Sequence, residues 1–88
     1  MTANTPPTVL QRSPCSFETL APGALAAWLM SEHSFVEQVP MASEAYRLAT
    51  DGMVVTIFTY GLVLAEGRNM PAAAMLLSDL CGTDGGGK

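Results

Sequence analysis

The sequence predicts an all-α fold, a small domain of three helices, on three observations. Apolar residues recur at spacings of three and four along most of the chain, as they do on one face of a helix. Pro22 and Asn69 stand where helices would begin, and Gly67 stands where one would end. A single candidate strand, Val54 to Tyr60, has no second segment with which it could pair.

The length of the chain limits it to one domain. A domain of 88 residues hides little more than half of the surface that its unfolded chain exposes, so the core is expected to be thin. We expect the helical domain to span residues 13–82. Residues 1–12, with two prolines, are expected to form a flexible N-terminal arm, and residues 83–88 a flexible, Gly-rich C-terminal tail.

The first main helix is expected over residues 22–38. Pro22 suits the first helical position, and Leu25, Trp28 and Leu29 follow near a helical period. The serines between residues 31 and 34 can interrupt this helix, because serine side chains bond locally to the backbone. A short helical turn is expected before it, over residues 16–20.

The second helix is expected over residues 43–66 and the third over residues 69–81. Ala45, Leu48 and Ala49 open the helical spacing of the second, and the Asp51–Gly52 pair, a turn signal, predicts a kink in it. Val54 to Tyr60 also fits a strand, since β-branched and aromatic residues favour strands. This alternative stays open.

Charge and composition exclude several functions. The formal net charge is −4, and the four cationic side chains stand singly, whereas nucleic-acid binding requires clustered cations. The first twelve residues do not have the character of a secretion signal, so a cytoplasmic location is expected. The small, acidic, Ala- and Gly-rich composition, nearly without Lys, resembles that of accessory proteins of bacteria or phages with GC-rich genomes.

No pattern of residues indicates catalysis, and we expect a protein that is not an enzyme and binds no cofactor. Cys15 and Cys81 lack the cationic or helix N-terminal setting that activates a thiol. His33 and Glu37 would share a face on a helix, but two ligands are too few for a metal held by the protein. A solvated His beside carboxylates is the alternative reading. No motif for phosphate binding is present.

The strongest feature is an uncharged run of thirteen residues, Met53 to Ala65. It is shorter than the roughly 20 residues of a membrane helix, and runs of this length are typical of buried helices. Gly61 and Ala65 form a small-xxx-small pair that lets another helix approach closely, inside the domain or across an interface. On such a helix Phe58, Gly61, Leu62 and Ala65 share one face.

These observations predict a module for protein–protein interaction, an adaptor, chaperone or inhibitor that presents an apolar helical surface. The partner is expected to be a protein, either a second copy or another chain, and the protein a homo-oligomer or part of a heterocomplex. The alternative function is membrane association through Met53 to Ala65. The residues expected to bind the partner are Phe58, Gly61, Leu62, Ala65, Trp28 and Tyr46, although a core position is the favoured alternative for Trp28 and Tyr46.

Overall fold

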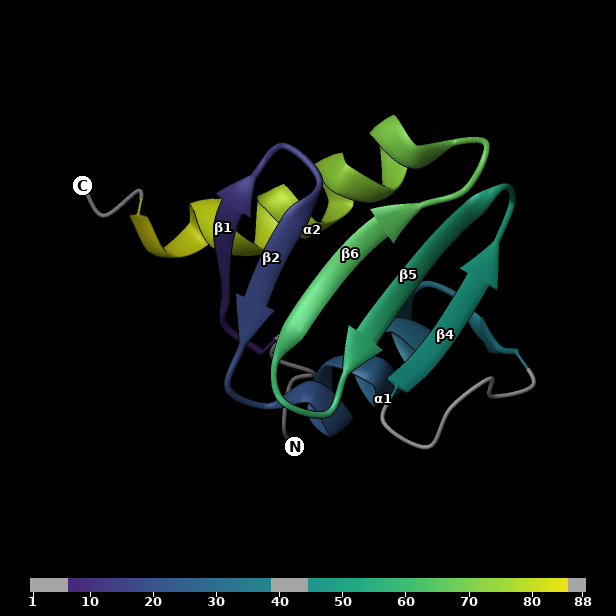
Figure 1. Ribbon diagram of the computed structural model, residues 1–88, viewed down its shortest axis with the longest axis horizontal. Helices are drawn as coiled ribbons and strands as arrows, with labels where there is room; N and C mark the ends of the chain where they lie inside the picture. Colours follow the sequence, from purple (N-terminus) through teal and green to yellow (C-terminus); the bar gives the residue numbers. More distant parts are fainter. Residues whose placement is uncertain (1–6, 39–44, 86–88) are drawn as a thin grey trace.

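The computed structural model describes residues 7–38 and 45–85, the last four of them by backbone alone. The chain order is β1 (Val9–Ser13), β2 (Ser16–Thr19), α1 (Pro22–Glu32), β3 (Val36–Glu37), β4 (Ala45–Thr50), β5 (Met53–Phe58), β6 (Leu62–Glu66) and α2 (Met70–Gly85). The strands form one antiparallel sheet in the order β1-β2-β6-β5-β4-β3 (Figure 1). The predicted all-α, three-helix fold is therefore wrong.

The segment predicted as the second helix forms three strands, β4, β5 and β6. Asp51 and Gly52 have φ angles of 48° and 81°, and the pairing of Thr50 with Met53 leaves only these two residues in the loop. Positive φ at both loop residues defines the hairpin turn that Asp-Gly favours. The pair that was interpreted as a helix kink is a β-turn, and it gives β5 its first partner.

The alternative strand at Val54 to Tyr60 is confirmed as far as Phe58. It lies in β5, with β4 on one side and β6 on the other, so its backbone groups are paired on both edges. The argument against it was that no partner strand existed. That argument failed because β4 and β6 mix alanine and leucine with only a few β-branched residues, and such segments resemble helices by propensity.

The first helix begins at Pro22, as predicted, but α1 ends at Glu32 instead of continuing to residue 38. His33 donates its backbone N–H to the carbonyl of Leu29 at 3.0 Å, and Ser34 then takes a φ of 60°. The serine-rich segment therefore ends the helix. The short helical turn expected at residues 16–20 is also wrong, because residues 16–19 form β2.

The C-terminal helix is present as α2, which begins one residue later than predicted and extends further. The carbonyl of Asn69 accepts the N–H groups of Ala72 and Ala73, at 3.1 and 3.2 Å, in its first turn. Residues 83–85 of the expected tail continue this helix. Residues 9–12 of the expected arm belong to β1, where Val9 is 1% exposed. Residues 1–6, the expected boundary over residues 39–44 and residues 86–88 lie outside the described residues.

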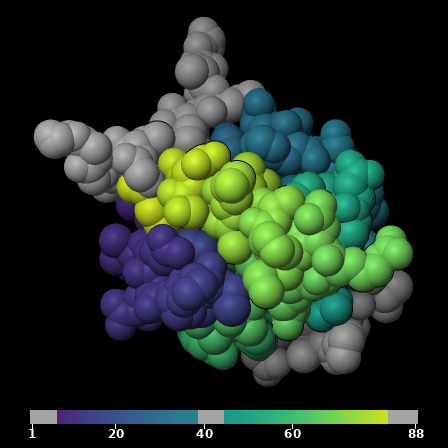
Figure 2. All heavy atoms as spheres, turned by 90° about the horizontal axis from the view of Figure 1, so that it is seen from above, coloured from purple at the N-terminus to yellow at the C-terminus, as the bar shows by residue number. Residues whose placement is uncertain are grey.

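Both helices lie on the same side of the sheet. They are behind the strands in Figure 1, and α2 contacts β1, β5 and β6 while α1 contacts β4 and β5. Figure 2 shows α2 (yellow-green) beside the purple residues of β1 and β2. Burial alternates along β2 and β6, as expected when one face packs on the core. The buried side chains facing the helices include Phe17, Leu48, Val55, Ile57 and Val63, which meet Leu25, Leu29, Ala73 and Leu77.

Candidate protein-binding site

The other side of the sheet, which we call the open face, is covered by no helix or strand of residues 7–38 and 45–85. It faces the viewer in Figure 1. The register places its side chains in rows across the strands. The row nearest the β5–β6 turn joins Leu10 to Glu18, Glu18 to Leu62, and Phe58 to Ala45. Four of these five side chains are apolar, so we call them the apolar row.

The next row of the open face is more polar. It contains Ser16, Leu64, Thr56 and Arg47. The Thr56 hydroxyl donates to Oε1 of Glu66 at 2.8 Å, and Nη1 of Arg47 lies 3.5 Å from the same oxygen. The Thr56 hydroxyl thus has a partner although Thr56 is buried, which removes the cost of an unpaired polar group. We call Arg47, Thr56 and Glu66 the polar network. The row of Arg47 and Thr56 lies between the apolar row and the third row, which contains Glu66, Val54 and Ala49.

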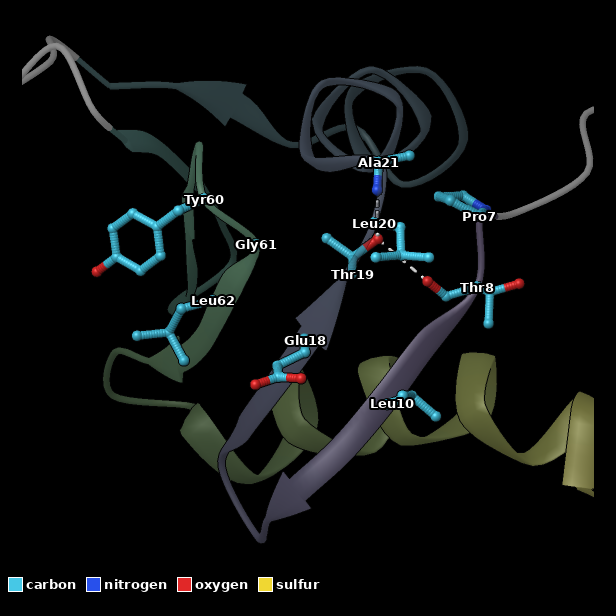
Figure 3. A pocket seen from close by; sticks show the side chains of 10 residues that line it. All are labelled: Pro7, Thr8, Leu10, Glu18, Thr19, Leu20, Ala21, Tyr60, Gly61 and Leu62. Atoms are coloured by element: carbon cyan, nitrogen blue, oxygen red, sulfur yellow. Dashed lines mark hydrogen bonds between the residues drawn. The ribbon is translucent and has the colours of Figure 1, made fainter.

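A groove of about 690 Å³ opens at one end of the apolar row (Figure 3). We call it the corner groove. Its walls include Leu10, Leu20, Tyr60 and Leu62, which come from β1, the β2–α1 turn, the β5–β6 turn and β6. Glu18 is the charged side chain among the residues that line it. The groove is thus an apolar depression with one carboxylate at its side.

Two large apolar side chains beside the corner groove are strongly exposed. Leu20 has a relative exposure of 104%, and Tyr60 one of 73%. The Tyr60 ring stacks on Phe58, with centroids 5.3 Å apart and planes inclined by 29°. Leu10 is 57% exposed. Single exposed apolar residues are ordinary, but several gathered around one depression are typical of interaction sites.

The β5–β6 turn is held close to β2 by its backbone. Gly61 donates to the carbonyl of Phe58 at 2.8 Å, and Thr19 donates to the carbonyl of Gly61 at 2.9 Å. Gly61 has a φ of 111°, and a Cβ built on it would lie 2.8 Å from the Thr19 carbonyl oxygen. Only glycine fits this approach without a shift. It brings Tyr60 and Leu62 next to the end of β2.

The structure brings together three of the six residues predicted to bind a partner. Phe58 and Leu62 belong to the apolar row, and Gly61 lies in the turn between them. Their proximity arises from a hairpin and not from a shared helix face. Ala65 is on the opposite side of β6, 5% exposed in the core. A partner-binding role for the first three stays a prediction.

Trp28 and Tyr46 lie on the helix side of the sheet, Trp28 on α1 and Tyr46 on β4. Tyr46 pairs with Ile57 across β4 and β5, on the side that faces α1, and is half-buried. The Trp28 ring is half-buried on α1, 4.8 Å from the His33 ring. Both residues pack against the core cluster. This position corresponds to the alternative reading of these two aromatics.

Sequence reasoning missed Leu10, Leu20 and Tyr60. Leu10 was assigned to a flexible arm, whereas it lies in β1 directly after the buried Val9 and is exposed. Leu20 stands two residues before Pro22, and a residue held in a turn before a helix is free to point outward. Tyr60 precedes Gly61, which was interpreted as a helix-packing position.

The described side chains do not assemble the elements of a catalytic or metal site. In residues 7–38 and 45–85, no group of three or more His, Cys, Asp or Glu is arranged to hold a metal ion. The face expected to be shared by His33 and Glu37 does not form, because α1 ends at Glu32. Cys15 and Cys81 are half-buried, and neither forms a disulfide bond. The strongest candidate site is therefore the open face with its corner groove.

The segment considered for membrane association, residues 53–65, forms the β5–β6 hairpin in the middle of the sheet. Insertion of this segment into a bilayer would break the pairing of β5 with β4 and of β6 with β2. Within the described ranges, neither helix combines the length and apolar character needed to cross a membrane.

Comparison of the chain with known protein families, with curated proteins and with solved structures finds no match. The function is therefore argued from the geometry of the open face.

Proposed function

We propose that this protein is a protein–protein interaction module that acts without a cofactor, as an adaptor, chaperone or inhibitor of a partner protein. Its binding surface is the open face of the sheet, with the corner groove as the main anchor point. A sheet surface takes the place of the helical surface expected from the sequence, because residues 53–65 form strands β5 and β6 and not a helix. The observation that carries the proposal is the exposure of Leu20 and Tyr60 beside an apolar groove.

The size of the exposed patch makes it a useful source of binding energy. Complete burial of a leucine or aromatic side chain is worth about 1.5–3 kcal/mol. Leu20 is fully exposed, and Leu10 and Tyr60 are more than half exposed, so covering the three would contribute roughly 5 kcal/mol. Exposed aromatic anchors next to a pocket are also the residues that dominate measured interface energies. Covering this patch would therefore favour a complex substantially.

The test is capture of partners from the native cell by two variants that carry the same chemical change on opposite sides of the molecule. Leu20→Asp places a carboxylate beside the corner groove, and Met75→Asp places one on α2, where Met75 is 67% exposed. Neither native side chain is buried, so both variants should fold like the wild type. We expect the same partners with wild type and Met75→Asp and their loss with Leu20→Asp.

Equal capture by all three proteins would refute the open face as the binding surface. A second measurement uses a fluorescent dye that binds apolar surfaces. Leu20→Asp should reduce dye binding more than Met75→Asp does, because the corner groove beside Leu20 is more apolar than the depression that Met75 lines together with Gln11 and Arg12. Sedimentation with liposomes separates this function from membrane association, for which wild type would sediment with the lipid.

A further inference from the structure

We propose that the open face binds a second copy of this chain, so that two sheets pack face to face in a symmetric dimer. This inference rests on the proposed function and identifies the partner of the same surface. In such a dimer the same patch is used by both copies, as two-fold symmetry requires. Three properties of the open face support a second copy: its area, its charge and its shape.

The area allows a small dimer interface. The strands are two to six residues long, so at about 3.4 Å per residue and about 4.8 Å between strands the sheet covers roughly 450 Å² before side-chain relief is counted. This is a little under a tenth of the 5137 Å² accessible surface of the chain, close to the share that an interface takes from a small protein. Two copies together would bury roughly 900 Å², the size of a small, weak interface, so we expect dissociation in the micromolar range.

The charge of the open face also suits a second copy. The charged side chains of this face are Arg12, Arg47, Glu18 and Glu66, which form two ion pairs within the chain, with N–O distances of 3.6 and 3.5 Å. Glu37 of β3 is opposite the core residue Leu48 and therefore lies on the helix side of the sheet. Two positive and two negative side chains cancel, so the whole formal charge of −4 lies elsewhere in the protein. Two copies therefore meet without net repulsion at this face. A strongly basic or acidic partner would find no complementary charge there.

The shape of the open face is compatible with self-association. A symmetric interface requires a projection and a depression on the same surface. Leu20 and Tyr60 project, and the corner groove lies directly beside them (Figure 3). The exposed side chains of one copy can therefore occupy the groove of the other, and the reverse contact forms at the same time. Every substitution in this surface consequently acts twice in the dimer.

The test is analytical ultracentrifugation of the purified full chain across the micromolar range, with three variants. Leu20→Asp would place a carboxylate near Glu18 of the other copy, and Tyr60→Ser removes an aromatic ring without adding charge. Met75→Asp on α2 is the matched control. We expect a dimer for wild type and for Met75→Asp, and a dissociation constant raised at least about tenfold by each of the other two changes. Circular dichroism and urea unfolding confirm that each variant is folded.

The remaining outcomes each refute the inference. A wild type that stays monomeric at all concentrations refutes the dimer, but the proposed function survives if Leu20→Asp still loses a captured partner. A monomeric wild type whose captured partners are unaffected by Leu20→Asp refutes both. A dimer weakened by Met75→Asp alone would place the interface on the helix layer, and one that none of the variants weakens would place it away from the open face.

Discussion

Replacing Gly61 by alanine should destabilise the protein by about 3 kcal/mol, because two separate costs add at this position. A φ of 111° is strained for a residue with a Cβ, at about 1–2 kcal/mol. The new Cβ would also lie 2.8 Å from the carbonyl oxygen of Thr19, so the end of β2 must move, at about 1–3 kcal/mol. Thr19 cannot move freely, since its N–H is bonded to the Gly61 carbonyl.

The assay is equilibrium unfolding in urea. A domain of this size has a total stability of about 4–13 kcal/mol, so a loss of 3 kcal/mol is a large fraction of it. With a urea dependence of about 1–3 kcal/mol per molar, the midpoint should fall by about 1–3 M. Gly61 variants are thus unsuitable for testing an interface, because they act on the fold itself.

The matched control is Gly23→Ala. Gly23 lies in the first turn of α1, and a Cβ built there would meet the Tyr46 hydroxyl oxygen at 3.7 Å, an ordinary contact. Alanine is the better helix former, so this variant should be unchanged or more stable by up to about 0.5 kcal/mol. A Gly61→Ala protein with the midpoint of the wild type would refute the geometry of the β5–β6 turn. A destabilised Gly23→Ala would refute the packing of α1.

Three further predictions concern the core, the sheet and the polar network. Leu77→Ala should lower the free energy of unfolding by about 2–5 kcal/mol, because Leu77 is fully buried. Met75→Ala, two residues earlier on α2, is the control and should stay within about 0.5 kcal/mol of wild type. Equal urea midpoints for the two variants would contradict the orientation of α2. Backbone amides of β5 and β6 should exchange with deuterium most slowly, since these are the two central strands of the sheet, and protection centred on the edge strands β1 or β3 would contradict the strand order. Glu66→Gln keeps an acceptor for Thr56 and removes only a half-exposed ion pair with Arg47, so urea unfolding should show a loss below about 0.5 kcal/mol, and a loss of several kcal/mol would contradict this.

The starts of the two helices could be predicted from the sequence, and the sheet could not. Pro22 marks the start of α1 and Asn69 the approach to α2, because these signals act within one turn of helix. The sheet depends on contacts between distant residues. β2 pairs with β6, Ser16 opposite Leu64, and no local preference of either segment reports that pairing. The prediction failed where stability came from partners that sequence patterns do not show.

The central error came from one dipeptide. Asp51–Gly52 is compatible with a helix kink at a cost of about 1 kcal/mol, and it is also the preferred two-residue hairpin turn. The turn reading alone would have supplied two paired strands and removed the objection to β5. The candidate site followed the same pattern: the structure places Phe58 and Leu62 on one face, but Ala65 was added because helical spacing was assumed. In a strand, Leu62 and Ala65 point to opposite faces.

The strand order has a consequence for how the binding surface comes into being during folding. β4, β5 and β6 are joined by two tight turns, so this half of the sheet can form through local contacts. The junction of β2 with β6 closes a far longer loop and is expected to form later, because the entropy of closure must be met first. Leu10 and Leu20 lie on one side of that junction, and Tyr60 and Leu62 on the other. The corner groove therefore exists only once the slowest pairing is complete, and a partner that recognises it would distinguish the finished fold from its precursors.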